Sequence, residues 1–221
     1  MSKTACIIGA TGLVGSKLVN LLISDDEFEK VKMFVRRPAE IDHAKVEEFV
    51  IDFDNQEEWQ KNLTGDVLFS CMGTTLKVAG SKNEQFKIDY TYQYNFAEAA
   101  CKNNIPAYVL ISSAGANPES QIFYSQMKGQ LDQVVLGLDF QIIRILKPSV
   151  LDGHRKERRR AEQFTIKALQ KLIPVLPFLR KYAPIKGYRV AQAMINSLKD
   201  YPDLKSRIYV LDEVLELSSK F

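Results

Sequence analysis

A tyrosine, a lysine and a pair of serines stand at spacings that suit proton transfer. Tyr124 and Lys128 form a Tyr-x-x-x-Lys pair in a stretch whose apolar pattern predicts a helix. A spacing of four residues places both side chains on one face of that helix. The ordinary pKa of tyrosine is about 10, and a nearby ammonium stabilises the phenolate and lowers that pKa. The pair therefore suits a tyrosine that exchanges a proton with a substrate oxygen, although both residues could also simply pack and solvate the helix.

Ser112 and Ser113 follow a predicted strand at 108–111, upstream of the tyrosine. A serine at a strand end is positioned to hydrogen-bond a substrate oxygen. We expect Ser113, which lies further beyond the strand, to be the catalytic serine, and Ser112 to lie beside a cofactor. One of the two could instead cap a turn.

A glycine-rich turn follows the first predicted strand, 5–8, and opens a helix. Its glycines, Gly9, Gly12 and Gly15, follow the spacing Gly-x-x-Gly-x-x-Gly. The first glycine allows a tight turn, the second lets the backbone approach a pyrophosphate, and the third lets helix and strand pack closely. Free N–H groups at the helix start attract the anion. The alternative is a glycine-rich turn without a ligand.

The second predicted strand, 31–35, ends in Arg36 and Arg37. Two guanidinium groups can hold the 2′-phosphate of NADP(H) through forked hydrogen bonds, whereas NAD(H) favours an acid at this place. We therefore expect NADP(H) as the cofactor; the alternative is a pair of solvated surface arginines. Asp52 and Phe53, after the third strand, are expected beside the adenine, or else Asp52 caps the next helix.

Strands and helices alternate along the chain. The expected strands are 5–8, 31–35, 46–51, 67–71, 108–111, 140–146 and 208–211, and the expected helices are 13–23, 57–61, 83–103, 124–136 and 190–199. This alternation predicts an α/β fold, a Rossmann-type doubly wound parallel sheet of about six or seven strands with helices on both faces. We expect a single NAD(P)-binding domain over 1–221, in which 148–221 supplies a small C-terminal lid on the substrate side and a sheet edge.

Composition narrows the function classes. The 221 residues carry a formal net charge of +3, which gives no general case for nucleic-acid binding. No run reaches the roughly 18 apolar residues of a membrane span. Three scattered cysteines make neither a disulfide framework nor a metal site, so no metal is expected, and free thiols without a signal-peptide pattern suggest a cytoplasmic protein. Tyr90 and Tyr94 suit a homodimer contact or packing on the sheet. The basic stretch 154–160 is expected to be a solvated helix start rather than an anion-binding patch.

Taken together, several motifs resemble the atypical short-chain dehydrogenase/reductases, among them the family of the human Tat-interacting oxidoreductase and its bacterial relatives. The motifs are Gly9-Ala10-Thr11-Gly12, Arg36-Arg37, Cys71-Met72-Gly73-Thr74-Thr75, Ser112-Ser113, the run from Phe123 to Gly129, and Pro148 to Leu151. The resemblance implies NADPH bound through Thr11, Gly12, Leu13, Val14, Arg36, Arg37, Met72, Gly73, Tyr124, Lys128, Leu151 and Arg159. In such enzymes the backbone around Pro148 runs along the nicotinamide, and Tyr124 is the proton donor in carbonyl reduction.

Three functions fit these observations. The first is an NADP(H)-dependent oxidoreductase acting on a small carbonyl or alcohol substrate, with Tyr124, Lys128 and Ser113 as catalytic residues. The second is a redox-sensing regulator that binds NADPH and a protein partner without turnover. The third is a nucleotide-sugar epimerase, for which the roughly 70 residues after Pro148 are few. The tyrosine–lysine pair favours the first.

Overall fold

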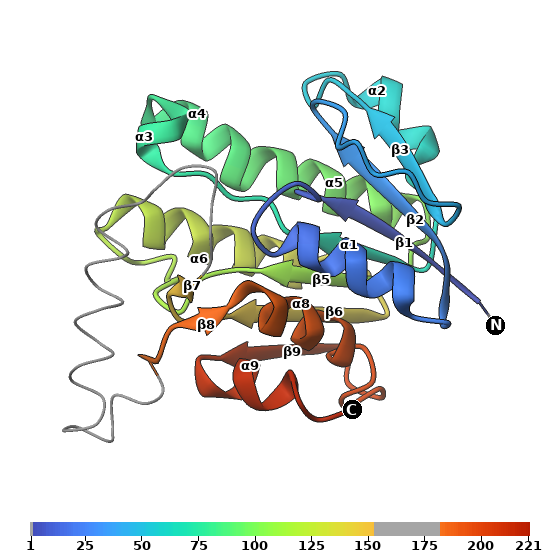
Figure 1. Ribbon diagram of the computed structural model, residues 1–221. Helices are drawn as coiled ribbons and strands as arrows, with labels where there is room; N and C mark the ends of the chain where they lie inside the picture. Colours follow the sequence, from blue (N-terminus) through green and yellow to red (C-terminus); the bar gives the residue numbers. More distant parts are fainter. Residues whose placement is uncertain (1, 153–181) are drawn as a thin grey trace.

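The computed structural model describes residues 2–152 and 182–221, and its centre is a seven-stranded sheet. The strands are β1 (Lys3–Ile8), β2 (Phe28–Val35), β3 (Val46–Val50), β4 (Val67–Ser70), β5 (Ala107–Ile111), β6 (Ile142–Lys147) and β9 (Ser206–Val210). Their order is β3-β2-β1-β4-β5-β6-β9 and every pairing is parallel, so all carboxyl ends meet at one edge, on the left of Figure 1. The predicted Rossmann-type fold is confirmed. Ligands of such sheets bind where the strand order reverses, which here is between β1 and β4.

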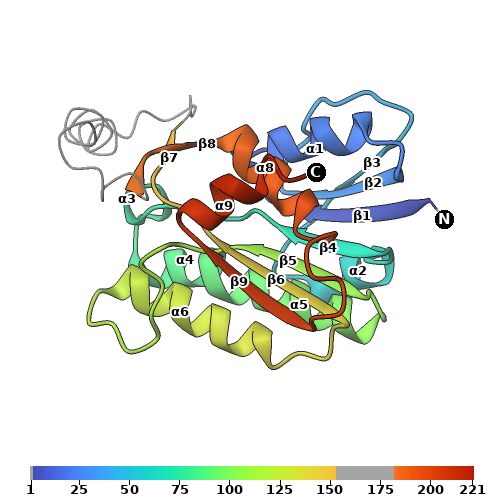
Figure 2. The same ribbon diagram turned by 90° about the horizontal axis from the view of Figure 1, so that it is seen from below.

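Helices cover both faces of the sheet, as Figure 2 shows. One face carries α1 (Gly15–Ser24), α8 (Gly187–Asn196) and α9 (Asp212–Leu217); the other carries α2 (Gln56–Trp59), the 3-10 turn η1 (Gln60–Asn62), α5 (Tyr92–Lys102) and α6 (Phe123–Leu136). Alternate residues of a strand point to opposite faces, so Ala5 and Ile7 of β1 enter one apolar core while Cys6 and Ile8 enter the other. Both faces of β1 are therefore buried in apolar cores, which explains the continuous apolar run from Ala5 to Ile8.

Between β4 and α5 the chain differs from the predicted helix 83–103. A short helix α3 (Leu76–Ala79) comes first, and α4 (Lys82–Phe86) passes through a π-helical turn, η2 (Lys87–Thr91), before α5 begins. Such turns insert one residue into a helix and often lie at functional sites. Here the turn brings Asp89 into the protein interior, where it is 1% exposed.

The sequence prediction also missed β7 (Leu151–Asp152), β8 (Ile185–Lys186) and α9, because elements of two to six residues carry no readable periodicity. β7 and β8 form a small parallel sheet beyond β6. The basic stretch 154–160, Arg159 and the rest of 153–181, a part of the expected lid and edge region, lie outside the described residues. Within the described residues, no helix combines the length and the hydropathy needed to cross a membrane.

A buried arginine attaches the last strand to the sheet. Arg144 of β6 is 0% exposed, and its guanidinium donates to the carbonyl oxygens of Ser197 (2.9 Å), Leu204 (3.0 Å) and Tyr201 (2.8 Å). These carbonyls belong to the connection between α8 and β9. Arginine has five N–H donors in a fixed fork, which suits a curved row of backbone acceptors.

Replacing Arg144 by methionine keeps the apolar stem and leaves these carbonyl groups without their donor. We expect Arg144→Met to lower the free energy of unfolding by about 3 kcal/mol, because buried acceptors lose their partner. Urea denaturation followed by circular dichroism measures the change. Lys205→Met removes an exposed charge from the same connection and should change stability by less than about 0.5 kcal/mol. Equal effects of the two substitutions would contradict the role of Arg144.

Candidate cofactor and substrate site

The glycine turn is packed against the end of β4. Gly9 has φ +77°, and a Cβ there would lie 2.5 Å from the carbonyl carbon of Cys71. A Cβ on Gly15 would lie 2.1 Å from the Gly9 carbonyl oxygen, and the Gly12 N–H donates to that same oxygen at 3.0 Å. Neither Gly9 nor Gly15 can therefore carry a side chain without displacing backbone.

The start of α1 has the properties of an anion site. Among the described residues no side chain caps this helix, and its first turn contains no acidic residue. Backbone N–H groups at a helix N-terminus attract a phosphate. The residues present, including Thr11, Leu13 and Val14, thus fit the pyrophosphate of a dinucleotide.

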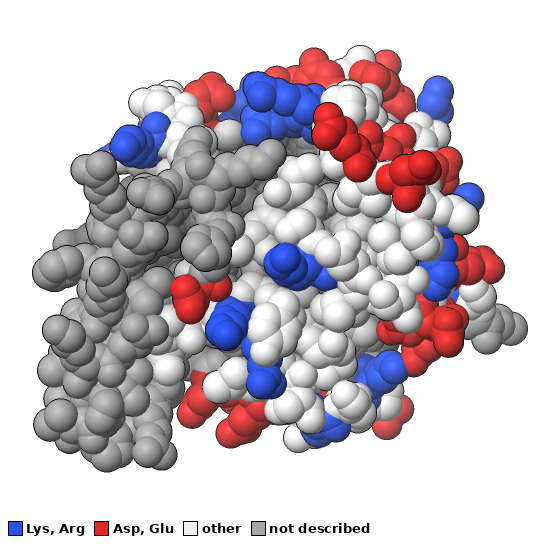
Figure 3. Space-filling model, viewed as in Figure 1, with Lys and Arg blue, Asp and Glu red and all other residues white. Residues whose placement is uncertain are grey.

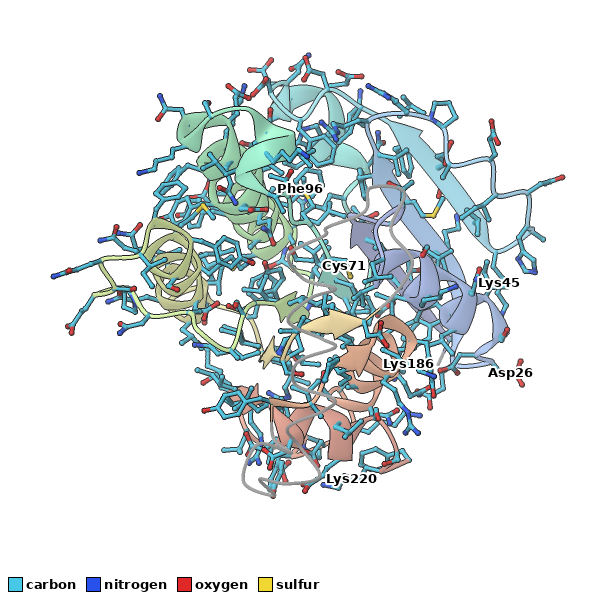
Figure 4. All side chains as sticks on the ribbon, turned by 60° about the vertical axis from the view of Figure 1, so that its left-hand side comes forward. Asp26, Lys45, Cys71, Phe96, Lys186 and Lys220 are labelled. Carbon is cyan, nitrogen blue, oxygen red and sulfur yellow. The ribbon has the colours of Figure 1, made fainter. Side chains whose placement is uncertain are left out.

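The opposite side of this turn rests on α8. A Cβ on Gly187 would lie 3.0 Å from the Leu13 carbonyl oxygen, so the first residue of α8 touches the backbone of the turn. Nearby, the Cys71 sulfur lies 3.7 Å from the Met194 sulfur. Figure 4 labels Cys71 in the middle layer of the molecule, between Phe96 on the α5 side and Lys186 on the α8 side. Burial raises the pKa of the Cys71 thiol well above its usual range, so it packs as an apolar group.

Arg36 and Arg37 lie one strand away from the glycine turn. Ile8 of β1 pairs with Phe34 of β2. Gly9 therefore follows the carboxyl end of β1, and the two arginines follow the neighbouring carboxyl end of β2. Both arginines are exposed. In Figure 3 a basic group lies at the top of the described part of this view, acidic side chains gather beside it at the upper right, and much of the middle is uncharged.

Asp52 and Phe53 are already engaged within the protein. The Asp52 carboxylate accepts a hydrogen bond from the Asp54 N–H at 3.0 Å. Phe53 is 5% exposed, and the centre of its ring lies 5.3 Å from the ring centre of Tyr92 and 5.4 Å from that of Phe96. Any contact of Phe53 with an adenine would therefore come mainly from its backbone.

A pocket of about 800 Å³ opens at the carboxyl edge of β4, β5 and β6. Of the predicted residues it contains Ser112, Ser113, Tyr124, Pro148 and Leu151. Met72 and Gly73 directly precede Thr74 of the pocket wall. Sequence reasoning missed the wall formed by the segment after β4, which consists of Thr74, Thr75, Leu76, Lys82 and Gln85. The Gly73-Thr74-Thr75 motif was the one available signal for it.

The two serines differ in their surroundings. Ser112 is 7% exposed, and its hydroxyl has no hydrogen-bond partner among the described residues. Its N–H donates to the Leu146 carbonyl at 2.8 Å, which continues the pairing of β5 and β6. Ser113 is half-buried. A buried hydroxyl without a partner costs free energy that a ligand can recover, so Ser112 is as strong a candidate as Ser113.

Lys128 lies behind this pocket rather than in its wall. It is 2% exposed, one turn after Tyr124 on α6, and its ammonium donates to the Ile111 carbonyl at 3.2 Å. Burial lowers the pKa of Lys128, and the carboxylates of Asp89 and Asp132 oppose that effect. The lysine is thus held below a tyrosine that is 40% exposed at the pocket.

Asp89 organises the wall after β4. Its carboxylate accepts from the Thr74 N–H at 2.8 Å and from the Gln85 amide at 3.5 Å. Its backbone carbonyl accepts from the Gln93 amide at 2.8 Å, and the Gln93 amide oxygen accepts from the Ser70 hydroxyl at 2.8 Å. The sequence signal was an acid with a glutamine one turn before it and a second glutamine one turn after it, which the predictions did not use.

The loop between β5 and α6 crosses α6 at a glycine. A Cβ on Gly129 would lie 2.2 Å from the Asn117 carbonyl carbon and from the Pro118 nitrogen. The Asn117 N–H also donates to the Ser125 carbonyl at 3.0 Å. This close approach fixes the loop that carries Ser113 relative to the start of α6.

Comparison with known proteins agrees with this geometry. A family model described as NAD(P)H-binding matches residues 9–151. Protein FMP52-1, mitochondrial, of Scheffersomyces stipitis is 32% identical over 98% of this chain and 99% of that protein. Protein FMP52, mitochondrial, of Saccharomyces cerevisiae is 33% identical over 70% of this chain and 68% of that protein.

Solved structures of low identity share the fold. MoeE5 in complex with UDP-glucose and NAD has a TM-score of 0.67 and 15% identity, covering 98% of this chain and 81% of its own. UDP-N-acetylglucosamine 4-epimerase from Methanobrevibacter ruminantium has a TM-score of 0.70 and 14% identity, covering 97% and 80%. At such identities the likeness shows the fold alone.

The expectation of a cytoplasmic protein is wrong. The similar proteins of S. stipitis and S. cerevisiae are both named as mitochondrial. The prediction rested on three free cysteines and on the missing signal-peptide pattern. Free thiols indicate a reducing compartment and do not select the cytoplasm among such compartments.

Gly129 and Gly115 offer a matched test of the loop geometry. Gly129→Ala should lower the free energy of unfolding by about 2 kcal/mol, because the loop must move despite the better helix propensity of alanine. In Gly115→Ala the added Cβ meets the Ser125 hydroxyl at an ordinary 3.5 Å, so stability should change by less than about 0.5 kcal/mol. Urea denaturation compares both with the wild type. A stable Gly129→Ala protein would refute the close crossing.

Proposed function

This chain belongs to the NAD(P)H-binding family and to the family of the fungal FMP52 proteins, and we propose that it is an NADP(H)-dependent oxidoreductase that interconverts a small carbonyl compound and its alcohol. The family match and the fold confirm the resemblance to atypical short-chain dehydrogenase/reductases. One observation carries the proposal. Ser112, Ser113 and Tyr124 line the same pocket, and Lys128 lies one turn below the tyrosine.

The residues that would hold the dinucleotide come from two strand ends. The backbone from Gly9 to Gly15 and the start of α1 would bind the pyrophosphate. Arg36 and Arg37 would bind the 2′-phosphate. When bound, the dinucleotide supplies the hydride that reduces the carbonyl carbon.

Tyr124 would donate its hydroxyl proton to the carbonyl oxygen as that hydride arrives. The carbonyl compound is thereby reduced to an alcohol, the dinucleotide is oxidised, and the tyrosine is left as a phenolate. The ammonium of Lys128 favours that phenolate, and a serine hydroxyl, from Ser112 or Ser113, orients the oxygen.

A nucleotide-sugar epimerase is the second candidate, because solved structures with this fold include proteins named as epimerases. It would use the same tyrosine and lysine. The segment after Pro148 would then have to bind a sugar nucleotide. The two candidates therefore differ in their substrates and not in their need for a dinucleotide.

The preference for NADP(H) depends on the arginine pair. We expect calorimetric titration of the wild type to give tighter binding of NADPH than of NADH. The double variant Arg36→Ala, Arg37→Ala should lose about 100-fold in NADPH affinity with little change in NADH affinity, because only the 2′-phosphate loses its partners. The double variant Lys30→Ala, Lys32→Ala removes two positive charges from the same strand as a control. An unchanged ratio of NADPH affinity to NADH affinity in the arginine variant would contradict the proposed role of the arginine pair.

Proton donation predicts a specific loss in Tyr124→Phe. We expect kcat for aldehyde reduction to fall by about 1,000-fold, while the affinity for NADPH stays within about twofold. The absorbance of the reduced nicotinamide follows turnover, and Tyr188→Phe, at an exposed tyrosine of α8, is the control. Wild-type protein that binds NADPH tightly and reduces no carbonyl compound would favour a regulator without turnover.

A further inference from the structure

Several polar groups of the pocket wall are already hydrogen-bonded within the protein. The Thr75 hydroxyl accepts from the Val78 N–H at 3.3 Å, and the Ser149 hydroxyl donates to the Ala183 carbonyl at 2.5 Å. The Thr74 N–H and the Gln85 amide are both engaged by Asp89. Each of these groups thus has part of its hydrogen-bonding capacity taken up within the protein.

Apolar side chains make up much of the remaining wall, and two of them are open to solvent. Leu76 is 46% exposed and Ile122 is 68% exposed, and both line the pocket. Val150, Leu151 and Leu211 line it as well. Exposed apolar side chains around a cavity indicate an apolar ligand. A sugar ring would be poorly matched, since each buried hydroxyl without a partner costs free energy.

Lys82 provides a charge at this apolar wall. It is the one lysine or arginine among the described residues that line the pocket, and no aspartate or glutamate is among them. Its ammonium lies 5.5 Å from the centre of the Phe123 ring, next in sequence to Tyr124. Within the described part of the chain, no carboxylate pairs with Lys82. A single ammonium among the described lining residues matches a singly charged anion better than a phosphate dianion.

We infer that the substrate is an apolar oxo acid, whose carbonyl oxygen meets the serines and Tyr124 and whose carboxylate meets the ammonium of Lys82. This inference rests on the proposed oxidoreductase function and names its substrate class. Lys82 would bind the end of the substrate that does not react. The apolar wall would cover the chain between the two ends, and the serine and tyrosine hydroxyls would select the carbonyl for reduction.

Two aldehydes of equal length test the substrate class with the full-length protein and saturating NADPH. One is octanal, and the other is the oxo acid with the same chain and a carboxylate at its far end. We expect kcat/KM to be about tenfold higher for the oxo acid, because a charge-assisted hydrogen bond is added. Lys82→Met should remove this preference, whereas Lys82→Arg should keep it. Lys77→Met, at a lysine of α3 outside the pocket, is the matched control.

A binding measurement makes the test independent of turnover. Octanoate and octanol are titrated calorimetrically into the protein with NADPH, and we expect octanoate to bind more tightly, with about a tenfold loss in Lys82→Met only. Equal binding of the two probes, or tighter binding of UDP-glucose than of octanoate, would overturn the oxo-acid inference. Failure of NADPH to bind, seen in its own titration, would instead overturn the proposed function.

Discussion

At Gly9 the backbone turns against the carbonyl group of Cys71, so closely that a methyl group would not fit between them. This contact joins the ends of β1 and β4 at the point where the strand order reverses. It also directs the chain into α1 and leaves the start of that helix facing outward. α8 then packs on the back of the same turn through Gly187, whose Cβ would crowd Leu13. The glycine turn and the start of α1, on the cofactor side of the site, are positioned by this strand pair.

The substrate side depends on buried charges in addition to the close backbone crossing at Gly129. Asp89 and Lys128 are both buried near the pocket, where Asp89 accepts from the Thr74 N–H and Lys128 donates to the Ile111 carbonyl. Asp132 forms an ion pair with Lys147 at 2.8 Å. The Lys147 ammonium also donates to the Ala116 carbonyl at 3.4 Å. Burying charges is expensive, and such groups persist where they fix the geometry that chemistry requires. Here they hold the loops after β4, β5 and β6 through hydrogen bonds to backbone groups and through one ion pair.

The sequence was informative where several signals coincide. Gly9, Gly12 and Gly15 follow an apolar strand and open a helix, so strand, turn and helix were predictable together. The wall from Thr74 to Gln85 was not predictable, because α3 has four residues and the π-turn breaks the helical period near Asp89. The choice between Ser112 and Ser113 depends on burial and hydrogen bonds, which spacing does not reveal.

The attachment of β9 through Arg144 has a consequence for the order in which the protein is made. Arg144 is synthesised 53 to 61 residues before most of the carbonyl groups that accept hydrogen bonds from its guanidinium. While the chain is still growing on a ribosome, β6 is an open edge strand with an unsatisfied positive charge. A charge on an open edge discourages pairing with strands of other nascent chains. The arginine that later fastens the final strand would therefore also protect the unfinished sheet from aggregation until that strand emerges.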